Sequence, residues 1–172
     1  MPQSARPNQF ALLGQRRFAP FFWTQFGGAG NDNLFKFAFT VMVAYRAEAA
    51  SALSTGLMVN LIAALYILPF VLFSATSGQL ADKYDKAVLM RRVKTLEIAI
   101  MALALWGFVT ANLPALLACA FGMGLHSTLF GPAKYAYLPQ HVNSAELTGA
   151  NGMTEMGTFV AILLGNLAGG LV

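Results

Sequence analysis

Polar residues that could carry chemistry lie inside apolar stretches of this sequence. The first group is Gly27-Gly28-Ala29-Gly30-Asn31-Asp32-Asn33-Leu34-Phe35-Lys36, within an apolar run from Phe18 to Tyr45 that is long enough to cross a bilayer. A charge at bilayer depth costs about 2.5–3.5 kcal/mol and is normally kept only where it faces a protein interior or a water-filled cavity. Asp32 and Lys36 are four residues apart, so on a helix they share a face and can pair. The transport-path residues predicted in this segment are Asn31, Asp32, Asn33 and Lys36.

Two further ionisable residues, Lys134 and Glu155, also lie inside apolar segments and are predicted to belong to the same path. Lys134 follows Gly131-Pro132, a pair that interrupts a helix and frees backbone carbonyls. Both side chains would lie at a similar depth, which would allow them to pair between helices. The structural alternatives are a packing pair for Asp32 and Lys36, snorkelling of Lys134 to the interface, and a counter-charge role for Glu155.

His126 and Glu97 are weaker candidates. His126 could relay protons, but a hydrogen-bonded packing histidine is the simpler interpretation. Glu97 follows a basic run and is expected to pair with Arg91, Arg92 or Lys94. The sequence contains no Walker lysine loop, no Gly-x-Ser-x-Gly and no His/Cys/carboxylate ligand cluster, so we predict no catalytic residue, metal or cofactor.

The composition indicates an integral membrane protein. Of the 172 residues, 57% are hydrophobic and only 10% are charged, against about a quarter in soluble domains. The net charge of +4 reflects basic residues beside apolar segments, which favours a role in membrane topology over nucleic-acid binding. The single cysteine, Cys119, excludes an intramolecular disulfide and indicates a small buried residue.

Five apolar segments must position the polar residues. We expect a cytoplasmic tail over 1–17 that is poorly ordered up to Gln15, and a helical kink at Pro69. Asn143-x-x-Glu146 resembles a capping box at the start of the last segment. The last segment is still apolar at Val172, so we expect an incomplete bundle. The predicted transmembrane helices are about 18–45, 55–81, 93–110, 114–138 and 145–172.

Basic residues indicate the orientation of these helices. Three lie in the N-terminal tail and five lie between the second and third segments, which places the N-terminus in the cytoplasm. The basic residues counted are Arg6, Arg16 and Arg17 in the tail, and Lys83, Lys86, Arg91, Arg92 and Lys94 in the link.

The link between the second and third segments carries a family resemblance. Gly78-Gln79-Leu80-Ala81-Asp82-Lys83-Tyr84-Asp85-Lys86 resembles the signature between helices two and three of the major facilitator superfamily. Asp85 replaces a glycine of that pattern, and Ala87 replaces its second basic residue. The resemblance implies an all-α fold, namely five helices of a six-helix N-terminal bundle. It also implies a gating motif that latches onto a second helical bundle, formed by Gly78, Asp82, Lys83 and Lys86.

Within that superfamily the chain is similar to bacterial lysophospholipid transporters. The similarity rests on Gly30-Asn31-Asp32-Asn33, Pro132-Ala133-Lys134-Tyr135, Gly149-Ala150-Asn151-Gly152-Met153-Thr154-Glu155 and Ala161-Ile162-Leu163-Leu164-Gly165. It implies flipping of lysophosphatidylethanolamine across the bacterial inner membrane by alternating access, with Asp32 and Lys134 meeting the headgroup. An acyltransferase/acyl-carrier-protein ligase is the enzyme partner implied. The alternatives are an exporter or carrier of another small solute, and a membrane anchor for a lipid-acylating enzyme.

Overall fold

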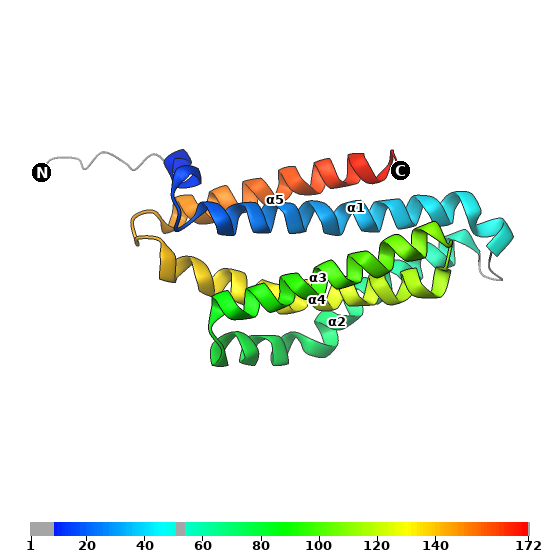
Figure 1. Ribbon diagram of the computed structural model, residues 1–172, viewed down its shortest axis with the longest axis horizontal. Helices are drawn as coiled ribbons and strands as arrows, with labels where there is room; N and C mark the ends of the chain where they lie inside the picture. The colour runs from blue at the N-terminus through cyan, green and yellow to red at the C-terminus, as the bar shows by residue number, and fades with distance from the viewer. Residues whose placement is uncertain (1–8, 51–53, 172) are drawn as a thin grey trace, which may run out of the picture. The chain divides into compact units, whose positions relative to one another are not determined.

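The computed structural model describes residues 9–50 and 54–171, with side chains described at 9–45 and 54–171. The described residues form one short 3-10 helix and five long α-helices, without a β-strand (Figure 1). This confirms the predicted all-α architecture. The elements are η1 (Gln9–Gly14), α1 (Ala19–Ala50), α2 (Thr55–Lys83), α3 (Lys86–Val109), α4 (Leu113–His141) and α5 (Leu147–Gly169).

Capping residues explain where two helices begin. The Ser54 hydroxyl accepts a hydrogen bond from the Leu57 amide (3.4 Å) at the start of α2. The Asp85 carboxylate accepts one from the Val88 amide (2.9 Å), so α3 begins at Lys86, earlier than the apolar segment predicted from residue 93. Asp85, which departs from the superfamily signature, therefore satisfies an otherwise unbonded amide at a helix N-terminus.

The predicted disorder of the N-terminal tail is wrong for residues 9–15. Residues Gln9–Gly14 form η1, where Leu12 is buried, and an added Cβ at Gly149 of α5 would lie 3.1 Å from the Cβ of Gln9. The apolar Leu12 thus gives this part of the tail a reason to fold. The earlier tail residues, including Arg6, lie outside the described residues, as do the side chain of Arg46 and the C-terminal Val172.

The chain divides into two compact units, Met1–Phe37 with Leu138–Val172, and Ala38–Tyr137. In the first unit, α1 and α5 run in the same direction with their backbones in close approach. A Cβ added at Gly165 would lie 2.3 Å from the carbonyl oxygen of Gly30, and one added at Gly157 would lie 2.6 Å from the Phe22 ring. The Gln25 amide donates to the Thr158 hydroxyl (3.1 Å) in the same seam. Small residues on both helices therefore set the helix separation, as the glycines of both segments predict.

In the second unit, α4 packs against both α2 and α3. A Cβ added at Gly124 would lie 2.2 Å from the backbone oxygen of Tyr66 on α2, so the two backbones meet there. On the other side, added Cβ atoms at Gly122 of α4 and Gly107 of α3 would lie 3.2 Å from Ile100 and 2.9 Å from Leu116 respectively. Buried Cys119 lies in this packed region, as its apolar surroundings predict.

The α4–α5 link contains half of the predicted capping box. The Glu146 carboxylate accepts from the Asn143 amide (3.1 Å) and pairs with Arg17 (2.8 Å). No side-chain hydrogen bond from Glu146, the residue before Leu147, caps α5. Asn143 therefore does not start the helix as the box predicts, because a turn intervenes before Leu147.

Large apolar side chains remain exposed on the described helices, among them Val71, Ile98 and Phe159. By length and composition, α2 and α4 are candidate membrane spans. Charged residues interrupt the apolar sequence of α3, and Asn151 and Glu155 interrupt that of α5. Exposed apolar surface on this scale is typical of proteins that face lipid or another helical bundle.

We expect Gly165→Ala to destabilise the protein by about 2 kcal/mol, because the new methyl group must displace the α1 backbone at Gly30. Thermal unfolding of the full-length protein in detergent micelles measures the effect. Gly152→Ala on the exposed face of α5 is the matched control, since an added Cβ meets nothing there. The control should be neutral or more stable, because alanine is the better helix former. Equal melting temperatures for the two variants would contradict the described α1–α5 seam.

A pH dependence follows from Glu146. The hydrogen bond from the Asn143 amide, followed by the contact with Arg17, lowers the pKa of this carboxyl group. A carboxyl group whose pKa is lower in the folded than in the unfolded protein stabilises the fold at pH values above the unfolded pKa. This stabilisation is lost as the pH falls through the lowered pKa of the folded protein. Glu146→Gln should therefore lower the melting temperature near neutral pH, and the difference from the parent protein should shrink as the pH falls below the ordinary glutamate pKa of about 4.3. A difference independent of pH would exclude this contribution.

Candidate functional site

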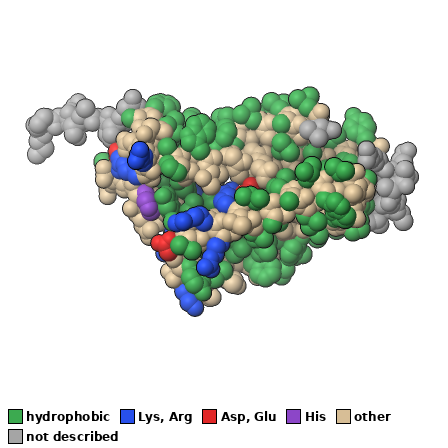
Figure 2. Space-filling model, in the orientation of Figure 1, with side chains coloured by type: hydrophobic (Ala, Val, Ile, Leu, Met, Phe, Trp, Pro, Cys, Tyr) green, Lys and Arg blue, Asp and Glu red, His purple; other side chains and the backbone are tan. Residues whose placement is uncertain are grey.

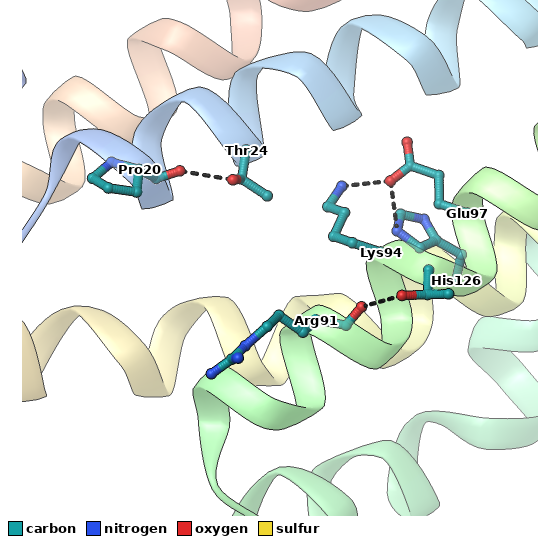
Figure 3. Close-up of polar contacts among 7 residues, drawn as sticks. Pro20, Thr24, Arg91, Lys94, Glu97 and His126 are labelled. Carbon is teal, nitrogen blue, oxygen red and sulfur yellow. Dashed lines mark hydrogen bonds and ion pairs between the residues drawn. The ribbon is translucent and has the colours of Figure 1, made fainter.

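Three titratable side chains meet between α3 and α4 in the second unit (Figure 3). The Glu97 carboxylate lies 2.7 Å from the Lys94 Nζ atom and 3.2 Å from the His126 Nε2 atom. Glu97 and His126 are buried, and Lys94 is half-buried. We refer to these three residues as the Lys94–Glu97–His126 cluster.

Phe130, one helical turn after His126, closes one side of the cluster. Its ring stacks on the His126 imidazole, with centroids 6.0 Å apart and an angle of 24° between the planes. The Lys94 Nζ atom lies 4.5 Å from the centroid of the same ring, which is within range of a cation–π interaction. The cluster therefore holds a buried carboxylate between two nitrogen groups and an aromatic face.

The sequence predicted only part of this cluster. The pairing of Glu97 with Lys94 is confirmed, since the two lie three residues apart on one face of α3. Contact between His126 and Glu97 was not predicted, because no spacing rule joins residues on different helices. The available signal was that each is an ionisable residue within a largely apolar segment. An imidazole beside a carboxylate can hold a proton or act as a structural hydrogen-bond donor.

Lys134 lies in the same unit, beyond the Gly131-Pro132 pair of α4. The predicted interruption at this pair is wrong, because the helix continues from Leu113 to His141. Lys134 is 7% exposed, and its Nζ atom lies 5.0 Å from the centroid of the Tyr135 ring. A buried ammonium group on a helix that qualifies as a membrane span is the feature for which the polar-path prediction was made.

The predicted path residues of α1 lie close together within about a turn and a half of the first unit. Asn31, Asp32, Asn33 and Lys36 are all half-buried. The Asn33 side-chain amide donates to the Ala29 carbonyl (2.8 Å), which ties this side chain to its own helix. The Asp32–Lys36 pairing stays a prediction.

Glu155 lies in the first unit but at a different level from Asp32. Glu155 is two residues before Gly157, which meets Phe22, whereas Asp32 follows Gly30, which meets Gly165. Phe22 and Asp32 are separated by about 15 Å of helical rise. Asp32 and Glu155 are therefore not brought together, and pairing of Glu155 with Lys134 stays a prediction because the two residues belong to different units.

The predicted gating motif lies where α2 ends and α3 begins. Asp82 and Lys83 are exposed, and Lys86 is half-buried in the first turn of α3. The Lys83 Nζ atom lies 5.6 Å from the centroid of the Tyr84 ring. A Cβ added at Gly78 would meet nothing within 4 Å, so contacts within the described residues do not require glycine there. Asp85, rather than Asp82, meets the helix N-terminus.

The Lys94–Glu97–His126 cluster generates a stability prediction. Glu97→Leu leaves the Lys94 ammonium beside an apolar group and should cost about 3 kcal/mol, because one partner of a buried pair is lost. The double variant Lys94→Met/Glu97→Leu should recover most of this loss. Thermal unfolding in detergent micelles compares the two. A double variant no more stable than Glu97→Leu would show that the charge left by the single change is not what destabilises the protein.

Comparison with known proteins places these features in a family. The profile of the transmembrane secretion effector family matches residues 11–172. The lysophospholipid transporter LplT of Cronobacter sakazakii is 29% identical over 175 aligned residues, which cover 100% of this chain and 40% of that protein. The transporters of the same name from Salmonella paratyphi B and Enterobacter sp. are each 32% identical, over 63% of this chain and 26% of their own lengths.

The chain thus spans less than half the length of these relatives. No solved structure matches it significantly. The family match covers all five long helices, and it confirms the predicted resemblance and the predicted all-α transmembrane fold of the N-terminal bundle type. This chain belongs to the transmembrane secretion effector family of the major facilitator superfamily, whose members are multi-pass membrane transporters.

Proposed function

We propose that this membrane transporter moves a lysophospholipid of the lysophosphatidylethanolamine kind across the bacterial inner membrane by alternating access. Relatives at 29% and 32% identity are lysophospholipid transporters, which supports this substrate class. The observation on which the proposal rests is Lys134, an ammonium group buried on α4, which is a candidate membrane span. Such a group is costly and needs a functional or structural reason to be there.

The chemistry of the substrate fits the predicted residues. The headgroup of lysophosphatidylethanolamine carries a phosphate and an ammonium group. A buried lysine can donate charge-assisted hydrogen bonds to the phosphate, and a carboxylate can accept them from the ammonium. We therefore assign the phosphate to Lys134 and the ammonium to Asp32. The remaining proposed path residues are Asn31, Asn33, Lys36 and Glu155.

Alternating access requires this bundle to rock against a second one. We propose that the α2–α3 turn acts as the gate, with Gly78, Asp82, Lys83 and Lys86 contacting the second bundle. Figure 2 shows basic side chains gathered near this turn. Lys83 is exposed at the end of α2, and Arg91 and Arg92 are exposed further along α3, outside the proposed gate. Their position supports a cytoplasmic location for the turn and for the N-terminus. An acyltransferase/acyl-carrier-protein ligase that consumes the imported lipid is the proposed enzyme partner.

The second candidate function is export of another small solute. The description of the family as secretion effectors favours this direction of transport. Both candidates use the same polar path, but they differ in substrate. Uptake assays in proteoliposomes that compare labelled lysophosphatidylethanolamine with soluble solutes therefore distinguish them.

We expect Lys134→Ala to lower lysophosphatidylethanolamine flux by roughly 10–100-fold, because a charge-assisted hydrogen bond of about 1.5–3 kcal/mol is lost. Asp32→Asn should lower flux to a similar extent. The measurement is uptake of the labelled lipid by proteoliposomes containing the full-length protein. Arg92→Gln, which removes an exposed charge outside the proposed path, should retain native flux.

Lys134→Arg provides a second comparison, because it keeps the positive charge but replaces the ammonium group with a planar guanidinium group. It should retain more flux than Lys134→Ala. Native lipid flux in Lys134→Ala at equal protein levels would refute the assignment of the phosphate to this residue. Absence of lipid flux in the parent protein, together with flux of a small soluble solute, would favour the exporter.

A further inference from the structure

Pro132 removes one backbone hydrogen bond from α4. Proline has no backbone N–H, so the carbonyl of residue i−4, which is Thr128, loses its partner within the helix. The helix nevertheless continues past Pro132 to His141. In an apolar setting, an unsatisfied backbone carbonyl is costly, and such proline sites persist where another group supplies the missing hydrogen bond.

Ser77 of α2 supplies that hydrogen bond. Its hydroxyl donates to the Thr128 carbonyl oxygen at 2.6 Å, between two residues 51 positions apart in the sequence. Ser77 is 1% exposed and Thr128 is 3% exposed, so water does not substitute for either group. The Thr128 hydroxyl donates to the Gly124 carbonyl (2.8 Å) and thus bonds a different carbonyl of α4.

The turn of α4 that precedes Pro132 is held from two sides. On the α2 side, the backbone of Tyr66 meets Gly124 so closely that no side chain fits there. On the α3 side, Glu97 contacts His126. Residues 124–128 are therefore fixed against both neighbours, and the direction of the helix beyond them depends on the geometry at Pro132.

We propose that Ser77 is a positioning residue for Lys134. Its hydroxyl replaces the backbone hydrogen bond that Pro132 removes, and so fixes the direction in which α4 carries the buried lysine two residues later. Without that bond the Thr128 carbonyl is left unsatisfied and the helix bends differently at the proline. The effect on transport rests on the proposed role of Lys134, whereas the effect on helix direction does not.

A double-mutant cycle in the full-length protein tests this inference. The variants are Ser77→Ala, Pro132→Ala and the two combined, because an alanine at position 132 restores the N–H that can bond Thr128. The geometry is read as the rate of maleimide labelling at Ala136→Cys, one turn past Pro132, in a Cys119→Ala background. Ala118→Cys, at an exposed position in the second turn of the same helix, is the control reporter. Ser74→Ala, one turn earlier on α2 and exposed, is the matched control variant.

We expect Ser77→Ala to change labelling at position 136 by at least about threefold in the Pro132 background, and by much less when residue 132 is alanine. Labelling at position 118 should stay constant, and Ser77→Thr, which retains the hydroxyl, should preserve the parent rate. An equal effect of Ser77→Ala in both backgrounds, or no effect in either, would overturn the proposal.

Transport provides the second readout. Ser77→Ala should raise the KM for lysophosphatidylethanolamine several-fold with a smaller change in kcat, whereas Ser74→Ala should change neither. If the parent protein carries no lysophospholipid, the proposed function fails, but the labelling cycle still decides the role of Ser77. If lipid flux is present and the labelling effects are simply additive, the proposed function survives and the inference about Ser77 fails.

Discussion

Inside an apolar helical bundle, each backbone or side-chain group that loses its ordinary hydrogen-bond partner must find another within the protein. The second unit of this chain meets this requirement at two places on α4. The carbonyl that Pro132 deprives of its amide bonds Ser77, and the imidazole of His126 meets the carboxylate of Glu97. Ser77 belongs to α2 and Glu97 belongs to α3. The two contacts that satisfy polar groups of α4 therefore also join the three helices.

Close backbone approach is the second requirement, since lipid gives apolar helices little reason to prefer one another. Gly30 and Gly165 meet this need in the first unit, and Gly124 meets it against α2 in the second. A methyl group at Gly165 or Gly124 would overlap the neighbouring backbone, whereas Gly27, Gly78 and Gly152 have open space around the position of a Cβ. Gly124 and Gly165 therefore fix the separation of neighbouring backbones, whereas Gly27, Gly78 and Gly152 do not.

Sequence reasoning predicted what depends on local spacing. The five apolar segments predicted the helices, and the separation of Lys94 from Glu97 by three residues predicted their pairing. The disorder expected for residues 9–15 was wrong because Leu12 folds back onto its own unit. The Ser77–Thr128 and Glu97–His126 contacts could not be predicted, because each joins two helices whose mutual rotation the sequence leaves open. The proposed path residues are subject to the same limit. Their position in the sequence predicts their depth along each helix, but it does not predict which residues of other helices lie beside them.

The described contacts explain two of the carboxylates in this chain. Glu97 pairs with Lys94 and contacts His126, and Glu146 pairs with Arg17, so both carboxylates have a structural explanation. Lys134 follows a proline, and Ser77 of α2 donates a hydrogen bond to the Thr128 carbonyl, which that proline leaves without its amide partner. A bundle that needed only a stable helix would gain by losing Pro132 and Ser77 together, since an ordinary residue at 132 would bond Thr128 directly. The combination is therefore better explained by the helix direction that it gives to the segment carrying Lys134 than by stability alone.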